Sequence, residues 1–268
     1  MHVNTLTLEL TRKCNLKCEH CLRGNAQNKS MSEQTMLQIF NHIDSVDTLS
    51  IGGGEPSLAI KELECLYNVL VQTNTQVQDI FLVTNGKKVS KPLIKSFAKL
   101  YSLLPYPEWS QFGISNDIYH VAERGYHVTP ASYVDELYDP KNTDLHNLPE
   151  SIFYTHLDGD RMKIFARGRA KNWGDNYDPY LDNIRLNSLS NPTVIDGEMY
   201  IAYDGTVVGD ANMSYNDMRK YSRGNVHQWF DLMINLAGST NHVHQEGYIF
   251  YTGEILAKYY NLLKRYEN

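Results

Sequence analysis

Cysteine is scarce in this sequence, and its distribution is uneven. The chain has 268 residues and four cysteines, and none of them follows Cys65. A secreted disulfide framework spreads its cysteines through the chain, so this distribution disfavours one. It also excludes a metal cluster held by cysteines in the second half, because the thiolates that such a cluster needs are missing there.

Long apolar runs and an excess of basic side chains are absent as well. No segment approaches the roughly 20 apolar residues that span a bilayer, and the first residues lack the pattern of a secretory signal. Lysine and arginine number 25 against 31 acidic residues, a formal net charge of −6. Nucleic-acid binding depends on clustered basic side chains, so a nucleic-acid partner is disfavoured. We expect a cytoplasmic protein without a membrane partner.

Three of the cysteines lie within eight residues, at Cys14, Cys18 and Cys21. Their spacing lets one tight loop aim three thiolates at one small object. A [4Fe-4S] cluster suits this donor set, because three thiolates bind three irons and leave the fourth iron open to a ligand. Zinc is the alternative, with His20 as a further ligand, although structural zinc usually takes two close ligand pairs.

The order of strand-like and helical patterns predicts the fold class. Expected strands cover residues 5–11, 49–51, 80–83, 112–115 and 162–166; expected helices follow a capping box at 30–33, ending near 44, and cover 58–71 and 91–103. Such alternation predicts parallel strands with right-handed crossovers. We therefore expect an α/β fold, a partial (β/α)6 TIM-like barrel, with its chemistry at the carboxyl ends of the strands. Residues 117–160 are expected to hold a helix and a long active-site loop.

The cysteine loop and several later motifs together resemble the radical S-adenosylmethionine (SAM) enzyme family. The matching residues, in order, are Cys14, Cys18, Cys21, Gly53-Gly54-Glu55-Pro56, Thr84-Asn85-Gly86 and Ser115-Asn116-Asp117. The resemblance is close over about the first half of the chain and loose over the second. It implies a [4Fe-4S] cluster on the three cysteines, with SAM as the second cofactor.

The resemblance also implies which residues contact SAM near the glycine run. Gly53 and Gly54 would let the backbone approach the cofactor closely, since glycine has no side chain to intrude. Glu55 would hold the ammonium group of the methionyl part. The alternative for these three residues is a glycine-rich turn with a solvated glutamate. Asn85 would line the SAM pocket, although Asn-Gly is also a common turn.

Four further residues complete the site that the resemblance implies. His20 would pack near the adenine, or else face solvent from the loop. Ser115 and Asp117 would hold the ribose hydroxyls, although an aspartate at a strand end is also an ordinary helix cap. Arg169, in a Gly-Arg-Ala segment, would meet the SAM carboxylate, or else form a surface salt bridge.

The end of the chain resembles a SPASM or twitch extension that lacks its auxiliary-cluster cysteines. Residues 198–203 and 206–208 suggest a hairpin turned by Asp204-Gly205. We expect a radical SAM core over residues 1–190. Residues 191–268 would add a C-terminal hairpin and helices that close the barrel within one structural unit.

The resemblance implies a function and leaves two others open. The expected enzyme cleaves SAM reductively to a 5′-deoxyadenosyl radical, which abstracts hydrogen from a peptide or small metabolite. A flavodoxin or ferredoxin would supply the electron, and no further catalytic side chain is assigned. The alternatives are an activating enzyme that installs a glycyl radical in a partner protein, and a non-catalytic iron–sulfur or zinc protein.

Overall fold

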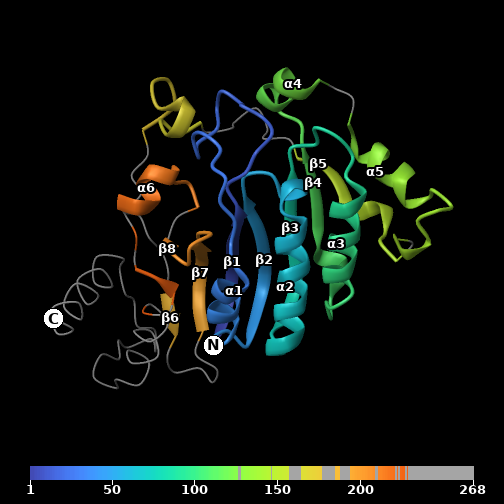
Figure 1. The fold of residues 1–268 in the computed structure, drawn as a ribbon, viewed down its shortest axis with the longest axis horizontal. Coiled ribbons are helices and arrows are strands. Elements are labelled where there is room, and N and C mark those ends of the chain that lie inside the picture. Colours follow the sequence, from blue (N-terminus) through green and yellow to red (C-terminus); the bar gives the residue numbers. More distant parts are fainter. Residues whose placement is uncertain are drawn as a thin grey trace.

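An eight-stranded sheet forms the centre of the molecule (Figure 1). The structure is a computed structural model, and it describes residues 1–125, 128–145, 147–156, 164–176, 185–187, 194–208, 211–220, 222, 224–226 and 228. The strands are β1 His2–Thr11, β2 Ser45–Gly53, β3 Gln76–Thr84, β4 Gln111–Ser115, β5 Phe153–His156, β6 Arg185–Asn187, β7 Val194–Ile201 and β8 Val207–Val208.

The strands run in the order β5-β4-β3-β2-β1-β7-β6, and β8 pairs with β7. All neighbours from β5 to β7 in this order pair in parallel. Of the strands in the described residues, only β6 and β8 run antiparallel to their neighbour, and each pairs with β7. The predicted α/β class with a parallel core is therefore confirmed, and the carboxyl ends of β1 to β5 lie at one edge of the sheet.

The predicted strand at 162–166 is wrong where the structure describes it. Phe165 forms only an isolated bridge to Asp175, and residues 162 and 163 lie outside the described residues. The fifth strand is β5, which pairs with β4. It has four residues within a polar segment, too few to show a period in the sequence.

Three helices, α1 Glu33–Phe40, α2 Ile60–Thr73 and α3 Lys91–Tyr101, lie side by side along one face of the sheet (Figure 1). Leu6, Leu8 and Leu10 of β1 are fully or almost fully buried in the core that these helices complete. Alternate residues of a strand point to the same face, so the other face of β1 carries Thr7 and Glu9.

The ends of α1 differ from the prediction. Ser32 is the N-cap, and its Oγ accepts a hydrogen bond from Thr35 N at 3.1 Å, so the helix begins two residues later than a cap at Ser30 implies. It ends at Phe40 rather than near residue 44. Ile43 is buried in the loop before β2. Its spacing from the apolar residues of the helix therefore led to the prediction of a longer helix.

The polar segment after β4 holds two helices, α4 Ile118–Arg124 and α5 Pro130–Leu137, before β5. It therefore contains more regular structure than the single helix and long loop that were expected. Tyr133 of α5 is fully buried and contacts the rings of Phe112 and Phe153, which explains why this segment packs beside β4 and β5.

The predicted hairpin is confirmed as β7 and β8. Ala202 N donates to Thr206 O at 2.8 Å across the turn, and the helix α6 Tyr215–Lys220 follows. A small core joins the hairpin to α6; its buried members are Tyr200, Ala202, Val208, Met213, Tyr215 and Met218. Because β7 also pairs with β1, the hairpin extends the same sheet. The division near residue 190 stays a prediction, since most of residues 209–268 lie outside the described residues.

No helix within the described part of the chain is both long and apolar enough to cross a membrane.

Candidate functional site

A pocket of about 290 Å³ lies where the parallel strands end. It brings together ten of the eleven side chains or backbone segments that the sequence singled out: Cys14, Cys18, His20, Cys21, Gly53, Gly54, Glu55, Asn85, Ser115 and Arg169. Asp117 is outside this lining but contacts two histidines that belong to it. The fourth cysteine, Cys65, lies apart in α2, as a structural residue would. The fold thus gathers the motifs, while their roles toward a cofactor stay predictions.

The glycine run holds the cysteine loop by its backbone. Gly54 N donates to Thr11 O at 2.7 Å, and Glu55 N donates to Lys13 O at 2.8 Å. A Cβ on Gly54 would lie 2.1 Å from Lys13 O, and Gly53 has a φ of +118°, which favours glycine. The glycines therefore allow the chain before Cys14 to lie against the end of β2. They serve a contact within the protein, in addition to the predicted close approach of a ligand.

Glu55 is buried and ties β2 to β3. Its Oε1 accepts hydrogen bonds from Thr84 Oγ1 at 2.6 Å and from Ser57 N at 3.0 Å, and its Oε2 accepts one from Asn85 N at 2.7 Å. The carboxylate is 1% exposed, so the alternative of a solvated glutamate is wrong. A carboxylate has about four acceptor positions, and one therefore remains for a donor in the pocket.

Asn85 connects the end of β3 to the cysteine loop. Its Nδ2 donates to Asn15 Oδ1 at 2.8 Å and lies 3.9 Å from Cys14 Sγ, within reach of a weak N–H···S bond. Lys87 Nζ donates to Asn15 O at 2.9 Å. The first half of the loop is therefore fixed by the Asn-Gly turn that the sequence placed near the pocket.

The segment around Arg169 clamps the second half of the loop. Arg169 Nε donates to Cys18 O at 2.7 Å, its Nη1 to Gly24 O at 2.8 Å, and its backbone N to Cys21 O at 3.0 Å. Gly168 has a φ of +55°, and a Cβ there would lie 2.4 Å from Cys21 O. Arg169 thus binds carbonyl oxygens of the loop, and the alternative of a surface salt bridge is wrong among the described residues.

The loop thiols are in surroundings that disfavour their charged form. Burial raises the pKa of Cys14, and it raises that of Cys18 to about 12. The neighbouring loop thiols add to both shifts, because like charges repel. A positively charged metal centre would reverse this balance by binding the thiolates.

The spacing of the loop cysteines bears on which metal centre fits. Within the described residues, one group of His, Cys, Asp or Glu side chains has all its ligand atoms within 4.8 Å of one another: His20, Asp117 and His120. The three loop cysteines do not form such a group. Zinc–thiolate bonds of about 2.3 Å keep all sulfurs of one zinc site within about 4.6 Å of each other. The thiolates of an iron–sulfur cluster bind different irons. The open loop therefore fits a cluster better than one zinc ion.

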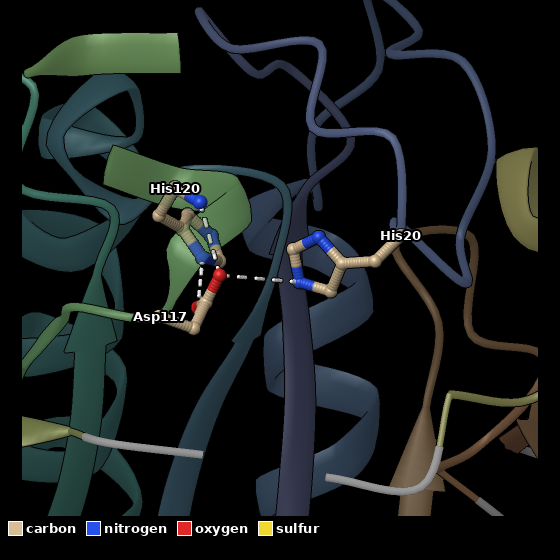
Figure 2. Close-up of side chains that lie close together, drawn as sticks. All are labelled: His20, Asp117 and His120. Carbon is tan, nitrogen blue, oxygen red and sulfur yellow. Dashed lines mark hydrogen bonds and ion pairs between the residues drawn. The ribbon is translucent and has the colours of Figure 1, made fainter. Parts of the chain in front are cut away.

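Asp117, His120 and His20 meet beside the pocket (Figure 2). Asp117 Oδ1 accepts from Tyr119 N at 3.0 Å and from His120 N at 2.9 Å, while Oδ2 bonds to His120 Nδ1. His20 Nε2 lies 4.0 Å from Asp117 Oδ1, and its ring stacks on Tyr119 at 4.6 Å. Asp117 is therefore the N-cap of α4, so its helix-cap alternative is confirmed, and these hydrogen bonds account for the group without an ion.

The surroundings of His20 and Asp117 determine the exposure of the histidine and the charge of the aspartate. His20 is only 9% exposed, so the alternative of a solvent-facing histidine is wrong. Burial alone would raise the pKa of Asp117, but the hydrogen bonds and charge of His120 outweigh it and hold the pKa below its usual range. Asp117 is thus ionised throughout the neutral range.

Two arginines that the sequence did not single out also shape the site. Arg124 of α4 donates from Nη1 to Asn85 O at 2.5 Å and to Ser115 O, joining the ends of β3 and β4. Arg12, just before the loop, donates to buried Glu9 at 2.9 Å, and its guanidinium contacts the rings of Tyr203 and Tyr215. No sequence motif identifies either arginine. For Arg124, the one indication in the sequence was its position one helix length after Asp117.

Comparison with known proteins finds relatives over part of the chain. No family model matches the chain. A probable GTP 3′,8-cyclase of Methanococcus maripaludis is 34% identical over 94 residues, and one of Methanococcus aeolicus is 28% identical over the same length. Each match covers 33% of this chain and 31% of the relative, so the matched part spans about a third of these curated relatives.

The fold is similar to a solved structure over nearly the whole chain. The crystal structure of BtrN in complex with AdoMet and 2-DOIA superposes with a TM-score of 0.53 at 13% identity, covering 89% of this chain and 83% of that one. BtrN and the curated relatives are radical SAM enzymes. The chain therefore has the radical SAM fold, and the resemblance that its cysteine loop and glycine run indicated is confirmed at the level of the fold.

Proposed function

We propose that this chain is a radical SAM enzyme that binds one [4Fe-4S] cluster through Cys14, Cys18 and Cys21. One observation carries the proposal: the loop cysteines open into the same pocket as Glu55 and Ser115, at the carboxyl ends of the strands. When bound and reduced, the cluster and SAM supply a 5′-deoxyadenosyl radical, which abstracts hydrogen from a peptide or small metabolite. The donor set supports the cluster, since three soft thiolates too far apart for one zinc ion suit three separate irons.

In this proposal the chain's own residues bind and orient SAM. Glu55 is held by three hydrogen bonds, so its remaining acceptor position points in a fixed direction and can take an ammonium group without reorganising. Ser115 and Asp117 supply acceptors for ribose hydroxyls beside it. The ring of His20, kept in place by Tyr119, offers a flat surface for adenine.

The pocket also needs to protect a reactive radical from water and stray hydrogen donors. Part of its wall is apolar, formed by Leu16, Leu22, Val83, Ile164 and Phe165. Such side chains exclude water and leave orientation to the few polar groups opposite them. The protein thereby supplies positioning and exclusion, while the cofactors supply the bond cleavage.

An electron donor of the flavodoxin or ferredoxin type and a cytoplasmic, reducing environment belong to the same proposal. The donor is needed because SAM cleavage consumes one electron, and the reducing environment agrees with the four free thiols. A glycyl-radical activating enzyme would use the same cofactors on a partner protein, but the Gly-Arg-Ala segment and the hairpin do not resemble that group. A non-catalytic zinc protein is disfavoured by the open spacing of the cysteines.

The proposal is tested by anaerobic reconstitution with iron and sulfide, then addition of dithionite and SAM. We expect the wild type to form 5′-deoxyadenosine, quantified by chromatography, and Cys18→Ala to form none. Cys65→Ala is the matched control, since Cys65 lies outside the pocket, and it should retain the activity. Protein that holds zinc, takes up no iron and cleaves no SAM would refute the proposal.

A further inference from the structure

A second hollow of about 500 Å³ adjoins the pocket of the cysteines. The two share Arg23, Gly24, Arg169 and Tyr215 in their walls. The remaining wall of the second hollow comes from Asn25 and Gln27, from most of the segment 166–171, and from Ser214 and the start of α6. A molecule that occupies both hollows would therefore pass beside two arginines before it reaches the cysteine loop.

The charge of this second hollow is mostly positive, in a chain whose net charge is −6. Arg23, Arg167, Arg169 and Lys171 line it, with Asp217 as the acidic residue. Asp217 is already paired with Arg167, at 2.7 Å. No carboxylate among the described residues forms a salt bridge with the other three cations.

The two shared arginines are held by neutral groups. Arg23 Nη1 donates to Met213 O at 2.7 Å, and the guanidinium lies over the Tyr200 ring at 4.7 Å. Arg169 uses two of its side-chain donors on carbonyls of the cysteine loop. A guanidinium has five N–H donors, so each arginine keeps at least three without an acceptor in the described chain.

Arg23 also feels the charge of a buried carboxylate, Glu9. That carboxylate is bonded to Arg12, at 2.9 and 3.0 Å, and therefore neutralises a different cation. The guanidiniums of Arg23 and Arg169 are thus fixed in place, carry uncompensated charge and have open donors. This is the arrangement that binds planar or tetrahedral oxyanions well, because little side-chain freedom remains to be lost.

We propose that the second hollow binds an anionic group of the substrate, a carboxylate or a phosphate, through Arg23, Arg169 and Lys171. The bound anion would place the rest of the substrate in the pocket of the cysteines. Assignment of the anion to a substrate rests on the proposed function. Binding of the anion itself depends only on the geometry of the hollow.

The test is calorimetric titration of the reconstituted protein, at low salt, with two simple probes. Succinate represents a carboxylate source and inorganic pyrophosphate a phosphate source. We expect one of them to bind at one site per chain, with a dissociation constant about fivefold higher in Lys171→Gln and at least tenfold higher in Arg23→Gln. Lys88→Gln, which removes an exposed lysine outside both hollows, should change it less than twofold.

Two results would overturn the inference: neither probe binds, or Lys88→Gln weakens binding as much as Lys171→Gln does. Arg23 packs against Tyr200, so its variant is included only if its melting temperature matches the wild type. Lys171 is exposed, and its substitution should leave the fold intact. Anion binding without any SAM cleavage by the wild type would sink the proposed function and leave the anion site. SAM cleavage without anion binding would refute the anion site and leave the proposed function.

Discussion

At the scale of single residues, Gly54 shows most directly how the sequence constrains the site. We expect Gly54→Ala to destabilise the protein by about 2 kcal/mol or more, because its Cβ would meet a backbone oxygen at 2.1 Å. Urea unfolding of the purified protein measures the loss. Gly52→Ala is the control from the same glycine run, since the nearest atom to its Cβ would be the Thr7 methyl carbon at 3.2 Å, and the nearest backbone atom would be at 3.7 Å. Equal losses in both variants would contradict this account of the glycine run.

Glu55 is the second residue whose role can be tested by a substitution that hardly alters its shape. Glu55→Gln keeps the shape but turns an NH2 group toward donors, so it should destabilise the fold by about 1–3 kcal/mol and weaken SAM binding. The exposed Glu19→Gln is the control, with an expected change within about 0.5 kcal/mol. Unchanged stability and SAM affinity in Glu55→Gln would show that its carboxylate is not needed.

Asp117 gives a dependence on pH. Its pKa in the folded protein lies below the ordinary value, so the carboxylate stabilises the fold fully above about pH 4, and this contribution is lost as the pH falls toward the folded pKa. The destabilisation by Asp117→Asn should therefore be largest near neutral pH and shrink below about pH 4. Unfolding at several pH values measures it, with exposed Asp135→Asn as a control. A destabilisation that grows in acid would have the wrong sign.

At the scale of elements, the segment that carries Gly168 and Arg169 is a clamp on the cysteine loop. A lysine carries its donors on one nitrogen and lacks the planar fork, so it cannot reproduce the two bonds that Arg169 makes from separate nitrogens to Cys18 O and Gly24 O. We expect Arg169→Lys to release iron to a chelator about tenfold faster than the wild type, as loss of an outer contact commonly does. Arg167→Lys is the matched control, because Arg167 pairs with Asp217 instead. Equal rates for the two variants would exclude the clamp.

Elements also show how far the sequence could be interpreted. The strands that lead to Cys14, Gly53, Asn85 and Ser115 were predictable, because each apolar run stops at a polar or glycine motif. The four-residue β5 was not, since its pairing depends on Phe112 and Tyr133 packing across the sheet edge. The contacts of Arg169 were also beyond prediction, because they join segments about 150 residues apart.

At the scale of the whole molecule, one sheet connects the site to the C-terminal hairpin. β1 pairs with β2 on one side and with β7 on the other, so the cysteine loop leaves the sheet between the glycine run and the hairpin. The pair of Glu9 and Arg12, with the rings of Tyr203 and Tyr215 against the guanidinium, extends that connection to α6. An aromatic and apolar core occupies this hairpin, in keeping with the lack of cysteines in the second half of the chain.

The central claim is that the loop cysteines hold a cluster with one iron open to SAM. Electron paramagnetic resonance of the reconstituted, dithionite-reduced protein tests it most directly. The account predicts a signal of a reduced [4Fe-4S] cluster that changes when SAM is added, and no such signal in Cys18→Ala. A cluster signal that saturating SAM leaves unchanged would contradict the claim, because an open iron beside this pocket would then bind no SAM.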